Sequence, residues 1–295
     1  MREFKDMGVA FVNLSGGEAT QYPKFGELIK YLEELEMPFY LTTNGIISET
    51  MLKKIMANKA LMGIKISIDG ISEQSYLSIR DPLQKRAIIY KTLFKTLQLL
   101  YDNNIFVEAA TLIHTGNINE LDEYPSMLAK YGIRKWDLGL LLPEGRGAQN
   151  KDKLTNGLKA ADFDRDFMSR IAHNSEKYGV NTSFGDINFN IADKMVFICG
   201  AGIDFMSIQA DLSVFPCPLL PYTRFKELYG FRLTDPREIH NVWNSKQFSA
   251  WIDQKTYGCP TCALRNKCGR CIIQLSEEGK TDPYENISAC YCAMI

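Results

Sequence analysis

Apolar stretches of strand length alternate with amphipathic stretches of helical length over the first 181 residues of the chain. Leucine and isoleucine at positions 28, 29, 32 and 35, for example, recur at the spacing of one helix face. The pattern predicts strands over residues 8–14, 38–42, 62–68, 105–111 and 136–141, and helices over residues 25–36, 49–58, 86–102, 118–131 and 162–178. Repeated units of this kind predict an α/β fold whose parallel sheet is either open or curled into a barrel.

The pattern changes twice in the second half of the chain. Residues 143–155 carry two glycines and several charges, which is typical of a loop that leaves a domain. From about residue 182 onward, short strands, turns and cysteines replace the long alternation. We therefore predict two domains, the first over residues 1–181 and the second over residues 182–295.

Polar residues and glycines gather where the first three predicted strands end. Ligands of parallel α/β folds bind at these ends, and adjacent glycines let a ligand approach the backbone closely. Ser67, Asp69 and Asn44 add a hydroxyl, a carboxylate and an amide, which suit a ribose or an amino acid. A single cluster of this kind is usually only a turn, whereas three together predict a binding face. The clusters are Ser15-Gly16-Gly17-Glu18, Thr42-Thr43-Asn44-Gly45 and Ser67-Ile68-Asp69-Gly70.

Composition and charge narrow the class of protein. Hydrophobic residues make up 45% and charged residues 23%, which is typical of a soluble globular protein. The formal net charge of −1 gives no sign of nucleic acid or an anionic membrane as a partner. The first residues lack the apolar core of a signal peptide, and no stretch is apolar for long enough to span a bilayer. We therefore expect a cytoplasmic protein that binds neither nucleic acid nor membranes.

All eight cysteines lie in the last third of the chain, and in a reducing compartment such a group more often binds metal than forms disulfides. The most specific pattern is Cys259-x2-Cys262-x5-Cys268-x2-Cys271, which is tight for one tetrahedral zinc site, since zinc ribbons separate their pairs by roughly 12 to 20 residues. Eight thiolates suit two four-cysteine iron–sulfur clusters. Structural zinc stays open as an alternative, and a thioredoxin-type pair at Cys268 and Cys271 lacks the expected strand-then-helix setting. The candidate metal ligands are Cys199, Cys217, Cys259, Cys262, Cys268, Cys271, Cys290 and Cys292.

These motifs together resemble the radical S-adenosylmethionine (SAM) superfamily, and specifically its members with a C-terminal SPASM domain that holds auxiliary iron–sulfur clusters. Gly16-Gly17-Glu18 matches the family's GGE motif, whose backbone groups hold the methionine amine of SAM. The clusters at residues 43–45 and 67–70 match the next two motifs, and Pro143-Glu144-Gly145-Arg146 resembles the P-x-G-R that follows the sixth barrel strand. By this resemblance the residues that bind SAM are Gly16, Gly17, Glu18, Asn44, Ser67 and Arg80.

The resemblance extends to the cysteines, because Cys199 and Cys217 match the first SPASM pair and Cys259 to Cys271 its C-x2-C-x5-C core. It implies two auxiliary 4Fe–4S clusters. The first would be held by Cys199, Cys217 and Cys271, and the second by Cys259, Cys262, Cys268 and Cys290. Cys292 is either spare or a fourth ligand of the first cluster.

The resemblance implies a partial TIM-type (β/α)6 barrel followed by a small cysteine-rich α+β domain. The implied function is that of a radical SAM oxidoreductase, a maturase that abstracts hydrogen from a ribosomally made peptide or protein. Its implied partners are that substrate and an electron donor such as a flavodoxin or ferredoxin. The alternative is a non-catalytic iron–sulfur or zinc-binding protein that binds a peptide or a partner.

Three departures from the family pattern qualify this expectation. The C-x3-C-x2-C motif of the catalytic cluster should lie upstream of Gly16, but no cysteine stands there. We therefore expect that the first barrel unit is missing, that the chain is a fragment not active alone, and that a third 4Fe–4S cluster binds only if the missing segment is supplied. Leu212 stands where the SPASM domain usually has glycine, and the last core spacing is x2 instead of x3. Pro218 stands where sulfatase-maturing relatives place an aspartate base, which disfavours that activity.

Overall fold

The computed structural model describes residues 1–79, 86–139, 141, 146–156, 158, 165–184, 187–188, 200–223 and 225–256. The chain divides into two compact units. Unit 1 comprises residues 1–141, 152–162 and 166–190, and unit 2 comprises residues 142–151, 163–165 and 191–295. Within the described residues, no helix is both long and apolar enough to cross a membrane.

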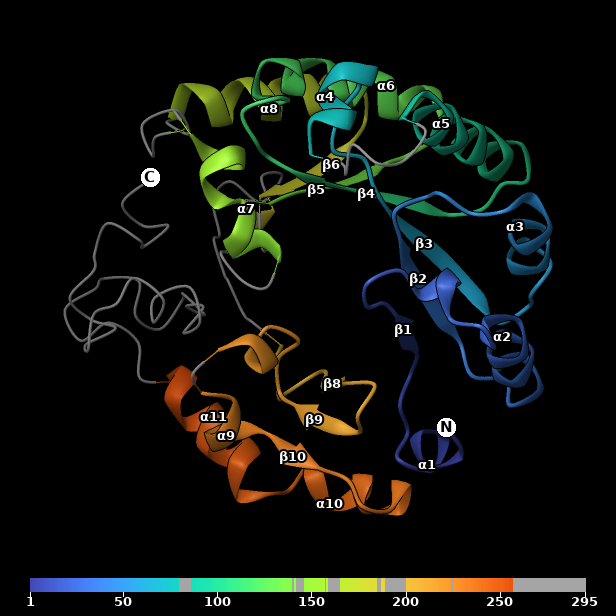
Figure 1. Cartoon of the computed structure of the whole chain (residues 1–295), viewed down its shortest axis with the longest axis vertical. Coiled ribbons are helices and arrows are strands. Elements are labelled where there is room, and N and C mark those ends of the chain that lie inside the picture. Colours follow the sequence, from blue (N-terminus) through green and yellow to red (C-terminus); the bar gives the residue numbers. More distant parts are fainter. Residues whose placement is uncertain are drawn as a thin grey trace. The chain divides into compact units, whose positions relative to one another are not determined.

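Unit 1 is built on a seven-stranded sheet whose strands follow one another in chain order (Figure 1). The strands are β1 (Val12–Leu14), β2 (Phe39–Thr43), β3 (Leu61–Ser67), β4 (Val107–Leu112), β5 (Lys135–Gly139), β6 (Asn181–Phe184) and β7 (Ile187–Asn188). The first six pair in parallel, and β7 turns back antiparallel to β6. The predicted α/β fold with a parallel sheet is thus confirmed.

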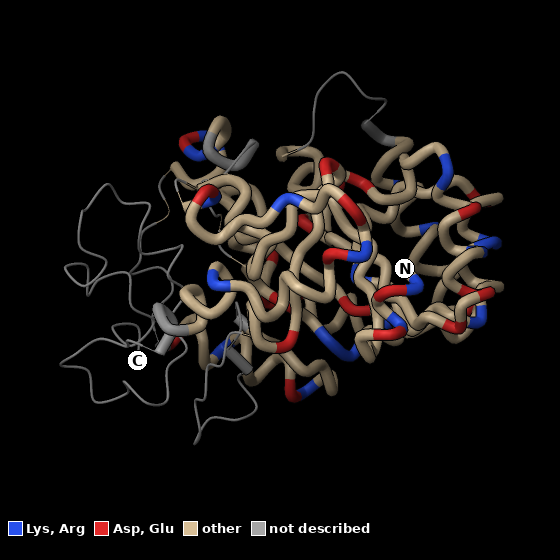
Figure 2. Tube along the Cα trace, turned by 90° about the horizontal axis from the view of Figure 1, so that it is seen from below, with Lys and Arg blue, Asp and Glu red and all other residues tan. Residues whose placement is uncertain are grey.

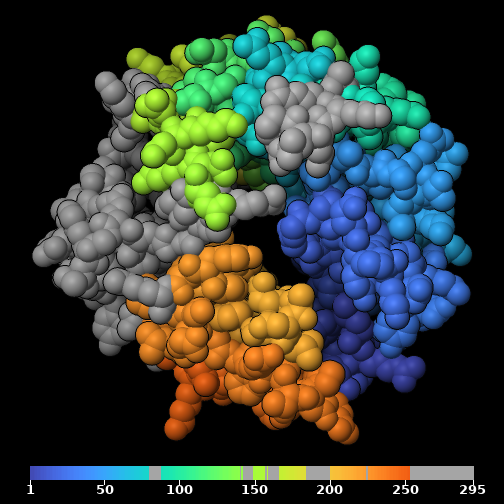
Figure 3. Space-filling model, viewed as in Figure 1, coloured from blue at the N-terminus to red at the C-terminus, as the bar shows by residue number. Residues whose placement is uncertain are grey.

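Helices cover one face of this curved sheet, called the outer face here (Figure 1). They are α2 (Phe25–Glu34), α3 (Glu49–Met56), α4 (Glu73–Ser78), α5 (Arg86–Asp102), α6 (Tyr124–Lys130) and α8 (Arg165–Lys177). The short helix α1 (Arg2–Asp6) precedes β1 and has no buried residue, and α7 (Arg146–Thr155) has residues in both units. Strand residues that point to the outer face, such as Leu41, Ile66 and Trp136, are fully buried, as is Leu32 of α2. The side chains of α2, α3 and α5 form a continuous surface in the space-filling view (Figure 3). The core of unit 1 therefore lies between the sheet and the helices.

Two predicted elements differ in the structure. Residues 146–155, predicted as a loop, form helix α7; Leu154 is buried there, and its carbonyl accepts a hydrogen bond from Thr115 N at 3.0 Å. The glycines near its start suggested a loop, but the later residues are good helix formers. The predicted helix over residues 118–131 is divided into a 3-10 turn, Ile118–Glu123, and α6, which begins one residue before Pro125 because proline is tolerated in a first helical turn.

The first strand is shorter than predicted, since β1 begins at Val12 and not at residue 8. It pairs with β2 from Val12 opposite Phe39, and it is the edge strand at this end of the sheet as the structure describes it. Acidic and basic residues are interspersed along the described chain, in keeping with the near-zero net charge (Figure 2).

Unit 2 contains a small antiparallel sheet of β8 (Ser207–Ile208), β9 (Ser213–Phe215) and β10 (Phe231–Arg232), with β9 in the centre. Its helices are α9 (Lys226–Tyr229), α10 (Ile239–Val242) and α11 (Lys246–Thr256), with 3-10 turns at Leu220–Tyr222 and Pro236–Glu238. A capping box at Asp235 and Glu238 fixes the start of the second turn.

The β8–β9 hairpin holds Leu212 in a backbone conformation that favours glycine. Gln209 N donates to Ser213 O at 2.8 Å, and Leu212 N donates to Gln209 O at 3.0 Å. A tight hairpin of this kind places one residue in the left-handed region, and Leu212 has a φ of 66°. The side chain therefore occupies a backbone conformation that glycine adopts without strain.

Replacing Leu212 by glycine should stabilise the protein. The left-handed conformation costs about 1–2 kcal/mol for a residue with a Cβ atom, and glycine removes this strain. The greater freedom of glycine in the unfolded chain offsets part of that stabilisation. We expect the free energy of unfolding to rise by about 0.5–1 kcal/mol in denaturant titrations. Leu212→Ala is the control, because it removes the side chain but keeps the strain. Equal stability of the alanine and glycine variants would contradict the explanation.

Candidate functional site

The loops that follow β1, β2 and β3 lie at the carboxyl ends of neighbouring parallel strands, where such sheets bind ligands. The loop after β1 contains Gly16 and Gly17, and a Cβ atom added at either would meet no other atom within 4 Å. Gly16 has a φ of 131°, which a side chain would strain, whereas Gly17 has an ordinary φ. The backbone here borders open space. This is what a loop needs if its N–H and C=O groups are to hold a ligand.

The carboxylate of Glu18 ties this loop to the end of β2. Its Oε1 accepts hydrogen bonds from Thr43 Oγ1 at 2.8 Å and from Thr20 Oγ1 at 2.7 Å. Its Oε2 accepts one from Asn44 N at 2.8 Å. Asn44 Oδ1 in turn accepts a hydrogen bond from Ile46 N at 2.8 Å, which shapes the following turn. The structure thus brings Gly16, Gly17, Glu18 and Asn44 into one hydrogen-bonded corner.

The loops after β3 and β4 are joined by a buried polar frame. His114 Nε2 lies 2.8 Å from the carbonyl oxygen of Asp69, and Asn117 Nδ2 donates to the same oxygen at 3.0 Å. Gly116 N donates to His114 Nδ1 at 3.1 Å, so the imidazole proton sits on Nε2 and points to Asp69. Asp69 Oδ1 accepts a hydrogen bond from Leu112 N at 2.9 Å. This frame fixes the loop that follows Ser67, the last residue of β3.

A second carboxylate, that of Glu120, holds the start of α4 beside this frame. It accepts hydrogen bonds from the hydroxyls of Ser72 and Ser75 and from the backbone N–H of Ile71 at 2.9 Å. Burial on its own would raise the pKa of Glu120. The hydrogen bonds from Ser72, Ser75 and the backbone outweigh burial, so the pKa is lowered overall. The charged carboxylate is therefore the form that stabilises the loop.

Glu120→Gln should lower stability at neutral pH by about 1 kcal/mol, because several donors lose a charged acceptor. Since the folded-state pKa of Glu120 is lowered, its contribution is complete above the pKa of the unfolded chain, about 4.3, and is lost as the pH falls through the folded value. Unfolding measured at pH 7 and again near pH 3 should show the difference between wild type and variant shrinking. A difference that grew on acidification would be inconsistent with this sign.

The inner face of the sheet, which points away from the helices, also carries charged side chains. Lys65, Glu108, Lys135 and Asp137 alternate there with buried apolar residues on β3, β4 and β5. None of these four residues belongs to the motifs that mark the strand ends. The available signal was a charged residue between two apolar ones inside a buried strand, as in Ile64-Lys65-Ile66.

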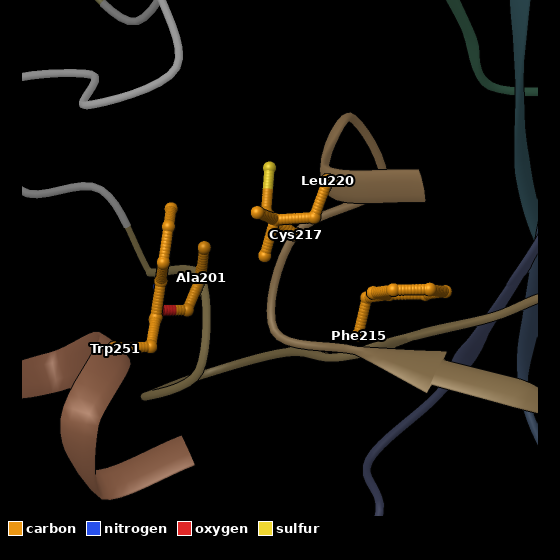
Figure 4. Close-up of a cluster of buried hydrophobic side chains, with 5 residues drawn as sticks. All are labelled: Ala201, Phe215, Cys217, Leu220 and Trp251. Atoms are coloured by element: carbon orange, nitrogen blue, oxygen red, sulfur yellow. The ribbon is translucent and has the colours of Figure 1, made fainter. Parts of the chain in front are cut away.

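Cys217 is the one candidate metal ligand among the residues that the structure describes. It is buried in unit 2 with Ala201, Phe215, Leu220 and Trp251 (Figure 4). Trp251 Nε1 donates to Ala201 O at 3.0 Å, which fixes the indole beside this cluster. An apolar shell that excludes water suits a thiolate ligand of a metal cluster. The described residues contain no group of three or more possible ligand side chains.

The remaining predicted site residues lie outside the described residues. These are Arg80, Cys199, Cys259, Cys262, Cys268, Cys271, Cys290 and Cys292.

Comparison with known proteins identifies relatives that match most of the chain. Residues 1–131 match the radical SAM superfamily. Mycofactocin maturase MftC of Mycolicibacterium smegmatis is 26% identical over 278 residues, which cover 92% of this chain and 68% of the relative. The subtilosin biosynthesis protein AlbA of Bacillus subtilis is 24% identical over 279 residues, covering 91% of this chain and 58% of AlbA.

Among solved structures, Streptococcus suis SuiB bound to its precursor peptide SuiA aligns with a TM-score of 0.72 and 18% identity, over 98% of this chain and 67% of SuiB. The likeness to SuiB concerns the fold. The chain spans about two thirds of the length of MftC and SuiB and little more than half of AlbA.

Proposed function

We propose that this chain, which carries a radical SAM domain over residues 1–131, belongs to a peptide-maturing enzyme that binds SAM at the ends of β1, β2 and β3. The observation that carries the proposal is the open glycine loop at Gly16 and Gly17, held in place by Glu18. The two relatives named above are a maturase and a biosynthesis protein of a bacteriocin. They support a peptide or protein as the substrate.

Each residue of the SAM site has a proposed task. The backbone at Gly16 and Gly17 would hold the methionine amine of SAM, because no side chain stands in the way. Glu18 would have an indirect role, because its carboxylate holds the turn at Thr43 and Asn44 in place. Ser67 at the end of β3, with Arg80, would complete the site. When bound beside a reduced iron–sulfur cluster, SAM supplies hydrogen-atom abstraction from the substrate.

We further propose that residues 182–295 are a SPASM domain with two auxiliary 4Fe–4S clusters. The shell of Phe215, Leu220 and Trp251 around Cys217 supports this role, because it keeps water away from a thiolate. The other proposed ligands follow the family pattern of cysteine spacing. An electron donor of the flavodoxin or ferredoxin class would supply the reducing electrons.

The test uses the product of the natural gene, purified without oxygen and supplied with SAM, a chemical reductant and a candidate precursor peptide. We expect iron and sulfide in the protein, release of 5′-deoxyadenosine and a change in peptide mass. Stoichiometric zinc without sulfide would contradict the clusters. Iron and sulfide with neither 5′-deoxyadenosine nor altered peptide would favour the alternative, a non-catalytic protein that binds a peptide or a partner.

A further inference from the structure

The inner face of the unit 1 sheet carries four charged residues on three adjacent strands, which we call the charged ladder: Lys65 on β3, Glu108 on β4, and Lys135 and Asp137 on β5. The strand register places Lys65 opposite Glu108 and Glu108 opposite Lys135. Parallel sheets are normally buried and apolar on both faces. A charged inner face therefore needs an explanation.

Ion pairs connect the whole ladder. Lys135 Nζ lies 2.8 Å from Glu108 Oε1, and Lys65 Nζ lies 3.8 Å from Glu108 Oε2. Lys65 also forms an ion pair with Asp137 Oδ2, and Ser183 on β6 donates a hydrogen bond to Asp137 Oδ1. The side chains thus hold one another in fixed positions across β3, β4, β5 and β6.

The four charged side chains differ in their exposure to solvent. The Glu108 side chain is 12% exposed, against 55% for Lys135, 32% for Lys65 and 40% for Asp137. Glu108 lies beneath the two lysines, and Asp137 is already engaged by Lys65 and Ser183. The hydrogen bond to Glu108 raises the pKa of Lys135, which keeps the ammonium charged. An incoming ligand therefore meets the ammonium groups of Lys135 and Lys65, together with the Asp137 carboxylate that Lys65 and Ser183 already engage, while Glu108 is largely out of reach.

An aromatic row adjoins the ladder on the same face. The ring of Tyr40 on β2 lies 5.9 Å from that of Phe11 and 6.4 Å from that of Phe106. Gly63 makes room for it, because a Cβ there would lie 2.7 Å from Phe106 and 2.9 Å from Tyr40. Phe11 is 48% and Phe106 44% exposed. The row continues into the ladder, since Tyr40 pairs with Gly63, two residues before Lys65 on β3, and Phe106 stands two residues before Glu108.

A purely structural role explains this surface poorly. Partly exposed ion pairs contribute only about 0–1 kcal/mol each, and the exposed aromatic rings contribute little while they face water. A surface with fixed charges, two accessible lysines and adjacent exposed rings matches a ligand with a carboxylate next to an apolar group. Fixed charges also favour binding, because they lose little freedom when the ligand arrives.

We propose that the charged ladder selects peptide substrates with an acidic side chain, whose carboxylate binds between Lys65 and Lys135 while a neighbouring apolar side chain packs on Phe11, Tyr40 and Phe106. This inference rests on the proposed peptide-maturing function and names its substrate class. Charge complementarity carries it, since Lys135 is the most exposed of the four charges and its counter-charge Glu108 is the least exposed.

The test compares three synthetic peptides of one length in which phenylalanine alternates with glutamate, glutamine or lysine. Binding to the full protein is measured by calorimetry at low and at high salt. We expect the glutamate peptide to bind at least tenfold more tightly than the glutamine peptide at low salt, and the lysine peptide to bind most weakly. The preference should shrink at high salt, because salt screens partly exposed charges.

Two variants distinguish the ladder from a general effect of charge. Lys135→Gln should reduce binding of the glutamate peptide to the level of the glutamine peptide. Glu108→Gln should increase binding of the glutamate peptide several-fold, since it removes the carboxylate that offsets both lysines. A merely structural role would not produce that gain. Lys30→Gln, on the outer helix α2, removes the same charge from a side chain 76% exposed and should change nothing.

Equal affinity for the glutamate and glutamine peptides would overturn the ladder's role and leave the peptide function standing. Failure of all three peptides to bind would also overturn it. The proposed function has its own readout in 5′-deoxyadenosine release and peptide mass, so the two failures can be told apart.

Discussion

Replacing Gly70 by alanine should destabilise the protein by about 3 kcal/mol or more, the upper end of the usual cost of overpacking. The new Cβ would lie 2.5 Å from Tyr76 Cα and closer still to the backbone nitrogen of Tyr76. Neither atom can move easily, because Tyr76 is fully buried and Ser75 is held by Glu120. The loop after β3 would have to detach from the frame formed by His114 and Asn117.

Gly139→Ala is the matched control for this change, since Gly139 also stands at the end of a parallel strand and a Cβ there meets nothing within 4 Å. We expect its stability to stay within about 0.5 kcal/mol of wild type in denaturant titrations. If both variants unfolded at the same denaturant concentration as wild type, the prediction that a Cβ at residue 70 clashes with Tyr76 would be wrong.

Gly17→Val should weaken SAM binding at least tenfold while leaving the fold intact. The Cβ of residue 17 would point into open space, and the φ of Gly17 is one that side chains adopt. If a ligand's charged groups fill this space, the valine methyl groups must displace them, at a cost of about 1–3 kcal/mol. SAM affinity, measured on the reconstituted natural gene product, and the melting temperature, measured without ligand, should therefore respond separately.

Gly16→Ala gives the contrasting case. Its φ of 131° strains any side chain, so stability and SAM binding should both fall. Unchanged SAM affinity in the Gly17→Val variant, with iron–sulfur content preserved, would rule out the proposed position of the cofactor.

Local pattern was enough to predict most of unit 1. The alternation of apolar runs and amphipathic stretches predicted β2 to β5 within a few residues, and the predicted helix over residues 86–102 agrees with α5 at both ends. Local pattern failed at α7, because the glycines near its start predicted a loop although the residues that follow favour a helix. It also missed the short helix α4, whose start depends on Glu120, a residue 45 positions away from Ser75.

The candidate site was predictable in part for the same reason. Glycines and polar residues at strand ends indicated a binding face, but the contact between Glu18 and Asn44 depends on how β1 and β2 pair. The charged ladder was hidden because a lysine inside an apolar strand indicates nothing until its neighbours on β4 and β5 are known. The similarity to radical SAM proteins, by contrast, is confirmed for residues 1–131.

The hydrogen bonds of Glu18 bear on how activity is diagnosed in relatives that diverge from this chain. Thr43 and Asn44 need its carboxylate whether or not a ligand is ever bound, so a descendant that did not bind the proposed cofactor would still be selected to keep a glutamate there. Residue 17 is under no such demand, since a side chain there meets no other atom within 4 Å. In a protein that did not bind the proposed cofactor, substitutions would therefore accumulate at residue 17 before they accumulated at Glu18. A glycine retained at position 17 is better evidence of a working site than the glutamate beside it.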